Sequence, residues 1–137
     1  AYAPEQLIYY GQSLGSAIAC HAACNVKPGA VILEGGFPSL PDFVRRSVAW
    51  LPIRTLTTAR FPTATYLSRL SCPVIIAHSR DDKTVPIESA NVLFKAAHEP
   101  KQMIMIQGRH AKGLEAHPEP FVDAIINISR ISASRHA

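Results

Sequence analysis

The feature that most constrains this chain is a repeated alternation of short apolar runs with segments of helical pattern. The apolar runs are 7–10, 30–33, 74–77 and 103–106. The helical segments that follow them are 14–24, 40–49, 87–97 and 119–129. Strands that are apolar throughout, without alternating polar positions, are typical of a parallel sheet with helices on both faces and right-handed crossovers. The sequence therefore predicts a three-layer α/β/α fold with a mostly parallel sheet.

The length of 137 residues and a hydrophobic content of 47% fit one domain with a substantial core. Residues 50–72 follow neither the helical nor the strand period, and we expect them to form an irregular or short-helical excursion over the sheet. The prediction is a single domain, 1–137, with a cap-like excursion around 37–72. The apolar residues of this excursion either accommodate an acyl or aromatic group or pack the excursion onto the sheet; they are Phe37, Phe43, Trp50, Leu51 and Ile53.

The sequence contains no run of about 18 apolar residues, the length needed to span a bilayer, and its first residues lack the features of a signal peptide. Its 3 cysteines are an odd number, which argues against a disulfide framework. Cys20, His21 and Cys24 have no second Cys/His pair at ligand spacing and lie in an apolar segment, so we expect buried thiols and no metal. Reduced thiols fit a cytoplasmic location.

The formal net charge of +4 is unevenly distributed. No acidic residue stands between Asp42 and Asp81, whereas six arginines do: Arg45, Arg46, Arg54, Arg60, Arg69 and Arg80. Such a basic segment steers an acidic substrate, contacts an anionic membrane surface or forms a solvated loop face. The arginines are not interleaved with aromatic residues in any nucleic-acid-binding motif, so nucleic acid is not an expected partner.

The segment Gly11–Gly15 has the pattern G-x-S-x-G, with an apolar run before it and a helical segment after it. This context is typical of a nucleophile elbow, in which a sharp strand-to-helix turn projects the hydroxyl of Ser13 away from both elements. We expect Gly11 and Gly15 to provide the room for this turn. The positive end of the following helix would stabilise negative charge that develops beside Ser13. A purely structural turn before a helix is the alternative interpretation.

Two further segments follow strands of the predicted sheet. Asp81 and Asp82 come after the run 74–77, and His110 comes after the run 103–106. The carboxyl ends of parallel strands meet at one sheet edge, so these side chains should lie near Ser13 in the order Ser, Asp, His. His110 would take the proton of the Ser13 hydroxyl, and a carboxylate would orient the imidazole. A turn carboxylate and an ordinary loop histidine are the alternatives.

The other histidines have less suitable positions. We expect His117 to be a surface cap residue, His21 and His98 to lie on helices, and His136 to lie in an exposed tail. His78 ends the run before the acidic loop, and we expect it beneath that loop, hydrogen-bonded to the backbone.

Together, four motifs resemble the C-terminal half of an α/β-hydrolase, closest to the serine-aminopeptidase-like and abhydrolase-domain serine hydrolases. The motifs are Tyr10–Gly15, Ile32–Phe37 with Ser39 and Leu40, Cys72–His78 with Asp82–Pro86, and Gly108–His110. The resemblance implies that the acid is Asp82, which stands four residues after His78 and begins an Asp-x-x-Val-Pro run, although Asp81 could substitute. It also implies that the N–H of Leu14 contributes to an oxyanion hole.

The resembled fold has about eight strands, and its elbow follows the fifth, whereas this sequence begins just before the corresponding strand. The missing strands would include the loop that donates the second oxyanion N–H, and loss of one donor costs about a hundred- to a thousandfold in rate. The first strand would then be an open edge, so self-association is expected.

The leading hypothesis is a serine hydrolase that cleaves a carboxylic ester, thioester or peptide-like bond of a small acyl substrate through an acyl-enzyme. Ser13 excludes enzymes that use aspartate or cysteine at the elbow. No cofactor is expected, because this chemistry needs none. The alternative is a truncated, non-catalytic module that acts through its exposed strand and basic segment.

Overall fold

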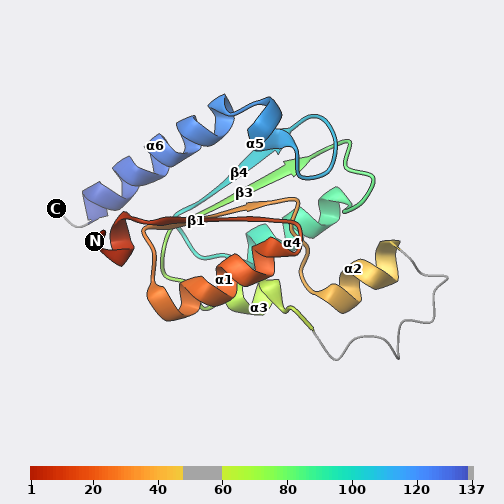
Figure 1. Ribbon diagram of the computed structural model, residues 1–137, viewed down its shortest axis with the longest axis horizontal. Coiled ribbons are helices and arrows are strands. Elements are labelled where there is room, and N and C mark those ends of the chain that lie inside the picture. Colours follow the sequence, from red (N-terminus) through yellow and green to blue (C-terminus); the bar gives the residue numbers. More distant parts are fainter. Residues whose placement is uncertain (48–59, 136–137) are drawn as a thin grey trace.

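The computed structural model describes residues 1–47 and 60–135 (Figure 1). Its four strands form one parallel sheet in the order β1-β2-β3-β4. Their bounds are Ile8–Gln12 for β1, Ala30–Glu34 for β2, Val74–Ser79 for β3 and Lys101–Ile106 for β4. The predicted parallel sheet is thus confirmed, and the carboxyl ends of all four strands lie at one edge.

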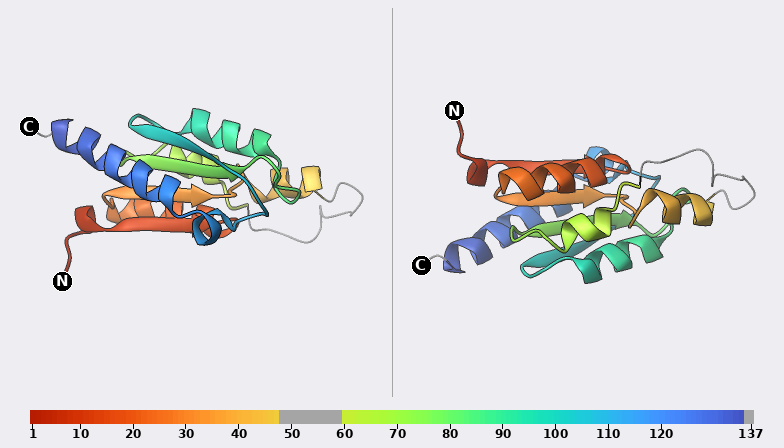
Figure 2. Two further views of the ribbon diagram at one scale, coloured as in Figure 1. Left: turned by 90° about the horizontal axis from the view of Figure 1, so that it is seen from above. Right: turned by 90° about the horizontal axis from the view of Figure 1, so that it is seen from below.

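Helices connect the strands and cover both faces of the sheet (Figure 2). Their bounds are Pro4–Gln6 for the 3-10 helix η1, Gly15–Val26 for α1, Leu40–Ser47 for α2, Thr63–Leu67 for α3, Ile87–Ala96 for α4, Gly113–Ala116 for α5 and Glu119–Arg135 for α6. The helices α1, α3 and α4 pack on one face, and α6 packs on the other. This is the predicted three-layer α/β/α arrangement.

The core consists of two clusters, one on each side of the sheet. Val31 and Leu33 of β2 point toward α1 and α4, whereas Ile32 between them points toward α6. β2 and β3 are buried along their whole length, as expected for strands that are apolar on both faces. Each fully buried aliphatic side chain stabilises the fold by about 1.5–3 kcal/mol, so the apolar side chains of β2 and β3 contribute strongly to the stability of the sheet.

The strands β1, β2 and β3 end later than their apolar runs because the hydrogen-bond ladder continues. In β3, His78 and Ser79 pair with Met105 and Ile106, although the apolar run ends at Ala77. The carboxyl edge therefore carries buried polar side chains. At the other terminus, α6 continues to Arg135, six residues beyond the predicted end.

The excursion around 37–72 is described in part. Within 60–72 the short helix α3 packs against α1 and α4, which agrees with the expected short-helical element. The ring of Phe37 is buried and stacks on Phe43 with centroids 4.8 Å apart, so these two aromatic residues pack against each other. The other apolar residues of the excursion, Trp50, Leu51 and Ile53, lie outside the described residues, as do the last two positions of the predicted helix 40–49.

Candidate active site

Ser13 occupies the turn between β1 and α1 in a backbone conformation that is uncommon for a serine. Its φ angle is +51°, in the left-handed region, where a residue other than glycine is strained by about 1–3 kcal/mol. The backbone is held there on both sides: the Ser13 N–H donates to the carbonyl of Glu34 at 2.9 Å, and the Ser16 N–H donates to the carbonyl of Ser13 at 3.0 Å. The turn thus fixes the direction of the Ser13 side chain at the carboxyl edge of the sheet.

The two glycines that flank Ser13 have different roles. A Cβ atom on Gly11 would lie 2.4 Å from the backbone oxygen of Gly15, so the strand and the helix approach too closely for any other residue at position 11. A Cβ atom on Gly15 would meet no atom within 4 Å. The expectation that both glycines make room for the turn is therefore correct for Gly11 and wrong for Gly15.

The structure brings Ser13, His110 and Asp82 together in one hydrogen-bonded row. Nε2 of His110 lies 2.9 Å from Oγ of Ser13, and Nδ1 lies 2.6 Å from Oδ2 of Asp82. The Asp82 side chain is 1% exposed and that of His110 is 20% exposed. Because a carboxylate only accepts hydrogen bonds, Nδ1 of His110 is the atom that donates to Asp82, and in a neutral ring Nε2 then faces the hydroxyl as an acceptor.

Asp82 makes the contacts expected of both interpretations, the turn carboxylate and the partner of the imidazole. Its Oδ1 accepts hydrogen bonds from the backbone N–H groups of Thr84 and Val85, both at 2.8 Å, as in a turn carboxylate. Its Oδ2 contacts His110. The turn contacts fix the carboxylate so that the second oxygen is directed at the imidazole. Asp81, the open alternative, is exposed, and its backbone N–H bonds to Oγ of Ser79.

Of the remaining histidines, only His78 adjoins the row among the described residues: its Nε2 lies 3.7 Å from Oδ2 of Asp82. His78 is fully buried beneath the acidic loop, and its Nε2 lies 2.8 Å from the carbonyl of Val85, which confirms the expected backbone contact. His117 is exposed at the C-cap of α5, and His21 lies on α1. His98 follows α4 instead of lying on it. His136 is outside the described residues.

Leu14, the predicted oxyanion donor, is the N-cap residue of α1, immediately after Ser13. Its side chain is partly exposed. Within the described part of the chain, the Leu14 amide takes part in no turn or cap hydrogen bond. Leu14 thus stands at the positive end of α1, next to Ser13 in the sequence, and a role of its N–H in an oxyanion hole stays a prediction.

A second polar cluster, which the sequence did not reveal, adjoins this row. Glu34 at the end of β2 is 0% exposed; its Oε1 accepts the N–H of Gly113 at 2.5 Å, and its Oε2 accepts the hydroxyl of Tyr10 and, at 3.3 Å, the amide of Gln12. The same amide lies 3.2 Å from the carbonyl of Ala111. These five residues are called the Glu34 cluster below.

Partial burial raises the pKa of Tyr10 above its ordinary value, and its hydrogen bond to Glu34 acts in the same direction. The phenol therefore remains a donor to the carboxylate over the physiological pH range. The only sequence signal for the cluster was an acidic residue that ends an apolar strand at the edge shared by Ser13 and His110.

Among residues 1–47 and 60–135, no group of three or more His, Cys, Asp or Glu side chains has the arrangement of a metal site. Cys20 lies in the core, and burial raises the pKa of its thiol to about 12. In the same described ranges, no helix is both long enough and apolar enough to cross a membrane.

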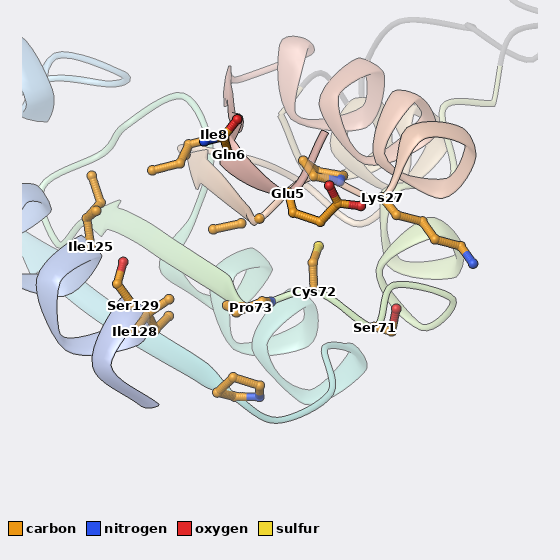
Figure 3. Close-up of a pocket in the computed structure, with 14 residues that line it drawn as sticks. Glu5, Gln6, Ile8, Lys27, Ser71, Cys72, Pro73, Ile125, Ile128 and Ser129 are labelled. Carbon is orange, nitrogen blue, oxygen red and sulfur yellow. The ribbon is translucent and has the colours of Figure 1, made fainter. Parts of the chain in front are cut away.

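A cavity of about 780 Å³ lies at the opposite, amino edge of the sheet (Figure 3). Residues at the beginnings of the strands and Ile125, Ile128 and Ser129 of α6 line it, with Glu5 and Gln6 of η1 facing them. It contains none of the residues of the Ser13–His110–Asp82 row and is separate from the candidate active site.

No family model matches the chain. An uncharacterized protein of Mycobacterium tuberculosis strain H37Rv is 31% identical over 105 residues, which cover 77% of this chain and 37% of that protein. Human alpha/beta hydrolase domain-containing protein 17B is 25% identical over 119 residues, covering 83% of this chain and 38% of that protein. The crystal structure of the esterase domain from a Rhodothermus marinus protein superposes with a TM-score of 0.61 at 26% identity, covering 76% of this chain and 50% of that one. The chain belongs to the α/β-hydrolase superfamily.

This α/β-hydrolase chain spans just under two fifths of the length of the curated relatives named above. A Pyrococcus furiosus esterase, at 15% identity, shares the fold with a TM-score of 0.68 over 90% of the chain. In this superfamily the carboxyl edge of the sheet is where a G-x-S-x-G serine is expected. That is the edge at which Ser13, Asp82 and His110 lie in the present structure.

Proposed function

We propose that this chain carries the catalytic triad of a serine hydrolase, with Ser13 as nucleophile, His110 as general base and Asp82 as the orienting acid. The observation that supports the proposal is the continuous row of hydrogen bonds from Ser13 through His110 to Asp82, which begins at a serine held at a φ of +51°. In addition, relatives and structural neighbours are named as hydrolases, among them an esterase and a lysophosphatidylserine lipase.

In the first half of the reaction, Oγ of Ser13 attacks the carbonyl carbon of the substrate while its proton passes to Nε2 of His110. Asp82 accepts the Nδ1–H of the ring and stabilises the imidazolium that forms. The developing oxyanion is stabilised by the N–H of Leu14 and the positive end of α1. The tetrahedral intermediate collapses when the leaving group takes the proton from Nε2, which leaves an acyl group on Ser13.

In the second half, a water molecule attacks the acyl carbon and His110 takes its proton. The intermediate then expels Oγ of Ser13, which recovers the proton, and a carboxylic acid is released. The bond cleaved is a carboxylic ester, a thioester or a peptide-like bond in a small acyl substrate. All of these pass through the same oxyanion, so the triad alone does not distinguish them.

Covalent labelling with a fluorophosphonate tests the proposal, because this reagent reacts with a serine that an adjacent base activates. The wild-type chain should be labelled at Ser13, and Ser13→Ala should not be labelled. Ser68→Ala is the matched control, since Ser68 is an exposed serine after α3 and should leave labelling unchanged. A folded wild-type chain that resists labelling would contradict the proposed function.

The alternative, a non-catalytic interaction module, has one structural observation in its favour. β1 is an edge strand that pairs only with β2 among the described strands, and its residues Ile8 and Tyr10 are exposed large side chains. Edge strands of this kind pair with other chains. A folded but unlabelled chain that elutes as a dimer in size-exclusion chromatography would favour this alternative.

A further inference from the structure

We propose that Glu34 is a positioning residue for the reaction: its buried carboxylate ties the loop that carries His110 to the strands that carry Ser13. This inference rests on the proposed function of the Ser13–His110–Asp82 row. Glu34 itself does not contact the reacting atoms. It acts through the backbone of residues 111–113 and through Gln12, the neighbour of Ser13 in sequence.

The imidazole of His110 lies on the loop 107–112 between β4 and α5, so its position depends on the contacts that hold this loop. Two hydrogen bonds to residues of the Glu34 cluster hold this loop. The Gly113 N–H donates to Oε1 of Glu34 at 2.5 Å, and the Ala111 carbonyl accepts the Gln12 amide at 3.2 Å. The two contacts lie three residues and one residue after His110, so both act on the backbone that directs its ring.

Glu34 is equally connected to the nucleophile. Its backbone carbonyl accepts the N–H of Ser13 at 2.9 Å, and its Oε2 accepts donors from Tyr10 and Gln12 on the strand that leads to Ser13. The next residue, Gly35, has a φ of +59°, and a Cβ atom there would lie 3.0 Å from Cε1 of His110. The backbone at the end of β2 thus contacts both Ser13 and the imidazole.

The chemistry of Glu34 suits this role. Within the described residues it forms no ion pair with a lysine or arginine. A buried carboxylate without a cation is costly unless hydrogen-bond donors surround it. Here a backbone N–H, a phenol and a side-chain amide converge on its two oxygens. A packed apolar side chain would fill the same space at lower cost, but it would not hold Gly113 and Gln12.

Kinetics with p-nitrophenyl acetate compare Glu34→Ala with Glu34→Gln. We expect Glu34→Ala to lower kcat about 100-fold with little change in KM, because a misplaced general base slows the chemical step by about that factor. Glu34→Gln keeps an oxygen for the Gly113 N–H and should restore most of kcat. If Glu34 only stabilised the fold, Glu34→Ala would lower the amount of folded enzyme but not the kcat of the folded fraction, and Glu34→Gln would have no kcat to restore.

Two controls separate positioning from stability. Ile128→Ala removes core volume in α6 beside the cavity at the amino edge, far from the row, and should lower Tm without lowering kcat of the folded enzyme. Glu115→Gln alters an exposed carboxylate close to the same loop and should leave kcat unchanged. Equal kcat for Glu34→Ala and wild type, or a loss no larger than that of Ile128→Ala, would overturn the inference.

Amide hydrogen exchange of Gly113, measured by NMR, tests the inference independently of activity. Exchange should be at least tenfold faster in Glu34→Ala than in wild type and close to wild type in Glu34→Gln. If the wild-type chain neither hydrolyses the ester nor reacts with fluorophosphonate, the proposed function fails. Gly113 exchange that is equally fast in Glu34→Ala and in wild type would overturn the positioning inference separately.

If Glu34→Ala does not fold, Tyr10→Phe replaces it, because this substitution removes one hydrogen-bond donor to Glu34 and almost no volume. Wild-type kcat and wild-type exchange in Tyr10→Phe would also overturn the inference.

Discussion

Nε2 of His110 lies 2.9 Å from Oγ of Ser13, although 97 positions separate the two residues in the sequence. Proton transfer across this contact requires a neutral imidazole, because a protonated Nε2 has no lone pair to accept the serine proton. The labelling rate with fluorophosphonate should therefore fall as the pH is lowered and the ring gains a proton. A rate that stays constant between about pH 5 and 8 would contradict a role for His110 as the base.

Replacement of the imidazole tests the same contact directly. His110→Ala should slow labelling of Ser13 at least 100-fold, since general-base catalysis contributes about 10²–10⁴-fold. His117→Ala is the matched control, because His117 is exposed at the C-cap of α5 and should react at the wild-type rate. Similar losses in the two variants would show that labelling depends on the stability of the loop and not on the imidazole.

Asp82 and Asp81 are adjacent in sequence but differ in environment, and this difference predicts their substitution effects. Asp82→Asn should lower kcat by about 10⁴, because an amide in place of Oδ2 favours the wrong imidazole tautomer. Asp81→Asn should keep wild-type kcat, because the Asp81 carboxylate is exposed. Steady-state hydrolysis of p-nitrophenyl acetate measures both. The opposite order would assign the acid to Asp81.

The sequence predicted the sheet and the meeting of Ser13, Asp82 and His110 at one edge because both depend on a simple rule. Apolar runs locate the strands, and the ends of parallel strands share an edge. The three side chains do lie within hydrogen-bond distance of one another in series, while their catalytic roles stay predictions.

Contacts that depend on direction and on long-range pairing could not be predicted. Glu34 ends an apolar strand, but its partner Gly113 is 79 positions away in the sequence and donates through its backbone, which leaves no residue-type signal. Gly15 was assigned the same steric role as Gly11 because both flank the serine. Only the structure shows that the Cβ of Gly11 would point into the helix, whereas that of Gly15 would meet open space.

Burial of Cys20 predicts a thiol that resists modification. Because burial raises its pKa from 9.0 to about 12, the thiol remains protonated in the folded chain at about pH 9, at which about half of an unfolded cysteine is ionised. The folded form then binds more protons than the unfolded form, so this residue's contribution to stability is lost as the pH rises from about 9 toward 12. Ellman's reagent at pH 8 should leave Cys20 unmodified in the folded chain and modify it in urea. Rapid modification of Cys20 under native conditions would contradict its burial.

Gly11 and Gly15 provide a matched pair for the turn at Ser13, since the same substitution should have opposite effects at the two positions. Gly11→Ala places a Cβ atom 2.4 Å from a backbone oxygen, which no side-chain rotation relieves, and overpacking of this kind costs about 1–3 kcal/mol or more. Gly15→Ala meets no atom within 4 Å, and in a helix alanine is more stable than glycine by up to about 1 kcal/mol. Urea unfolding should therefore give a lower midpoint for Gly11→Ala and an equal or higher midpoint for Gly15→Ala, with unchanged m values. A loss of stability in both variants would mean that the helix begins closer to the strand than the structure shows, and that both glycines are required for the turn.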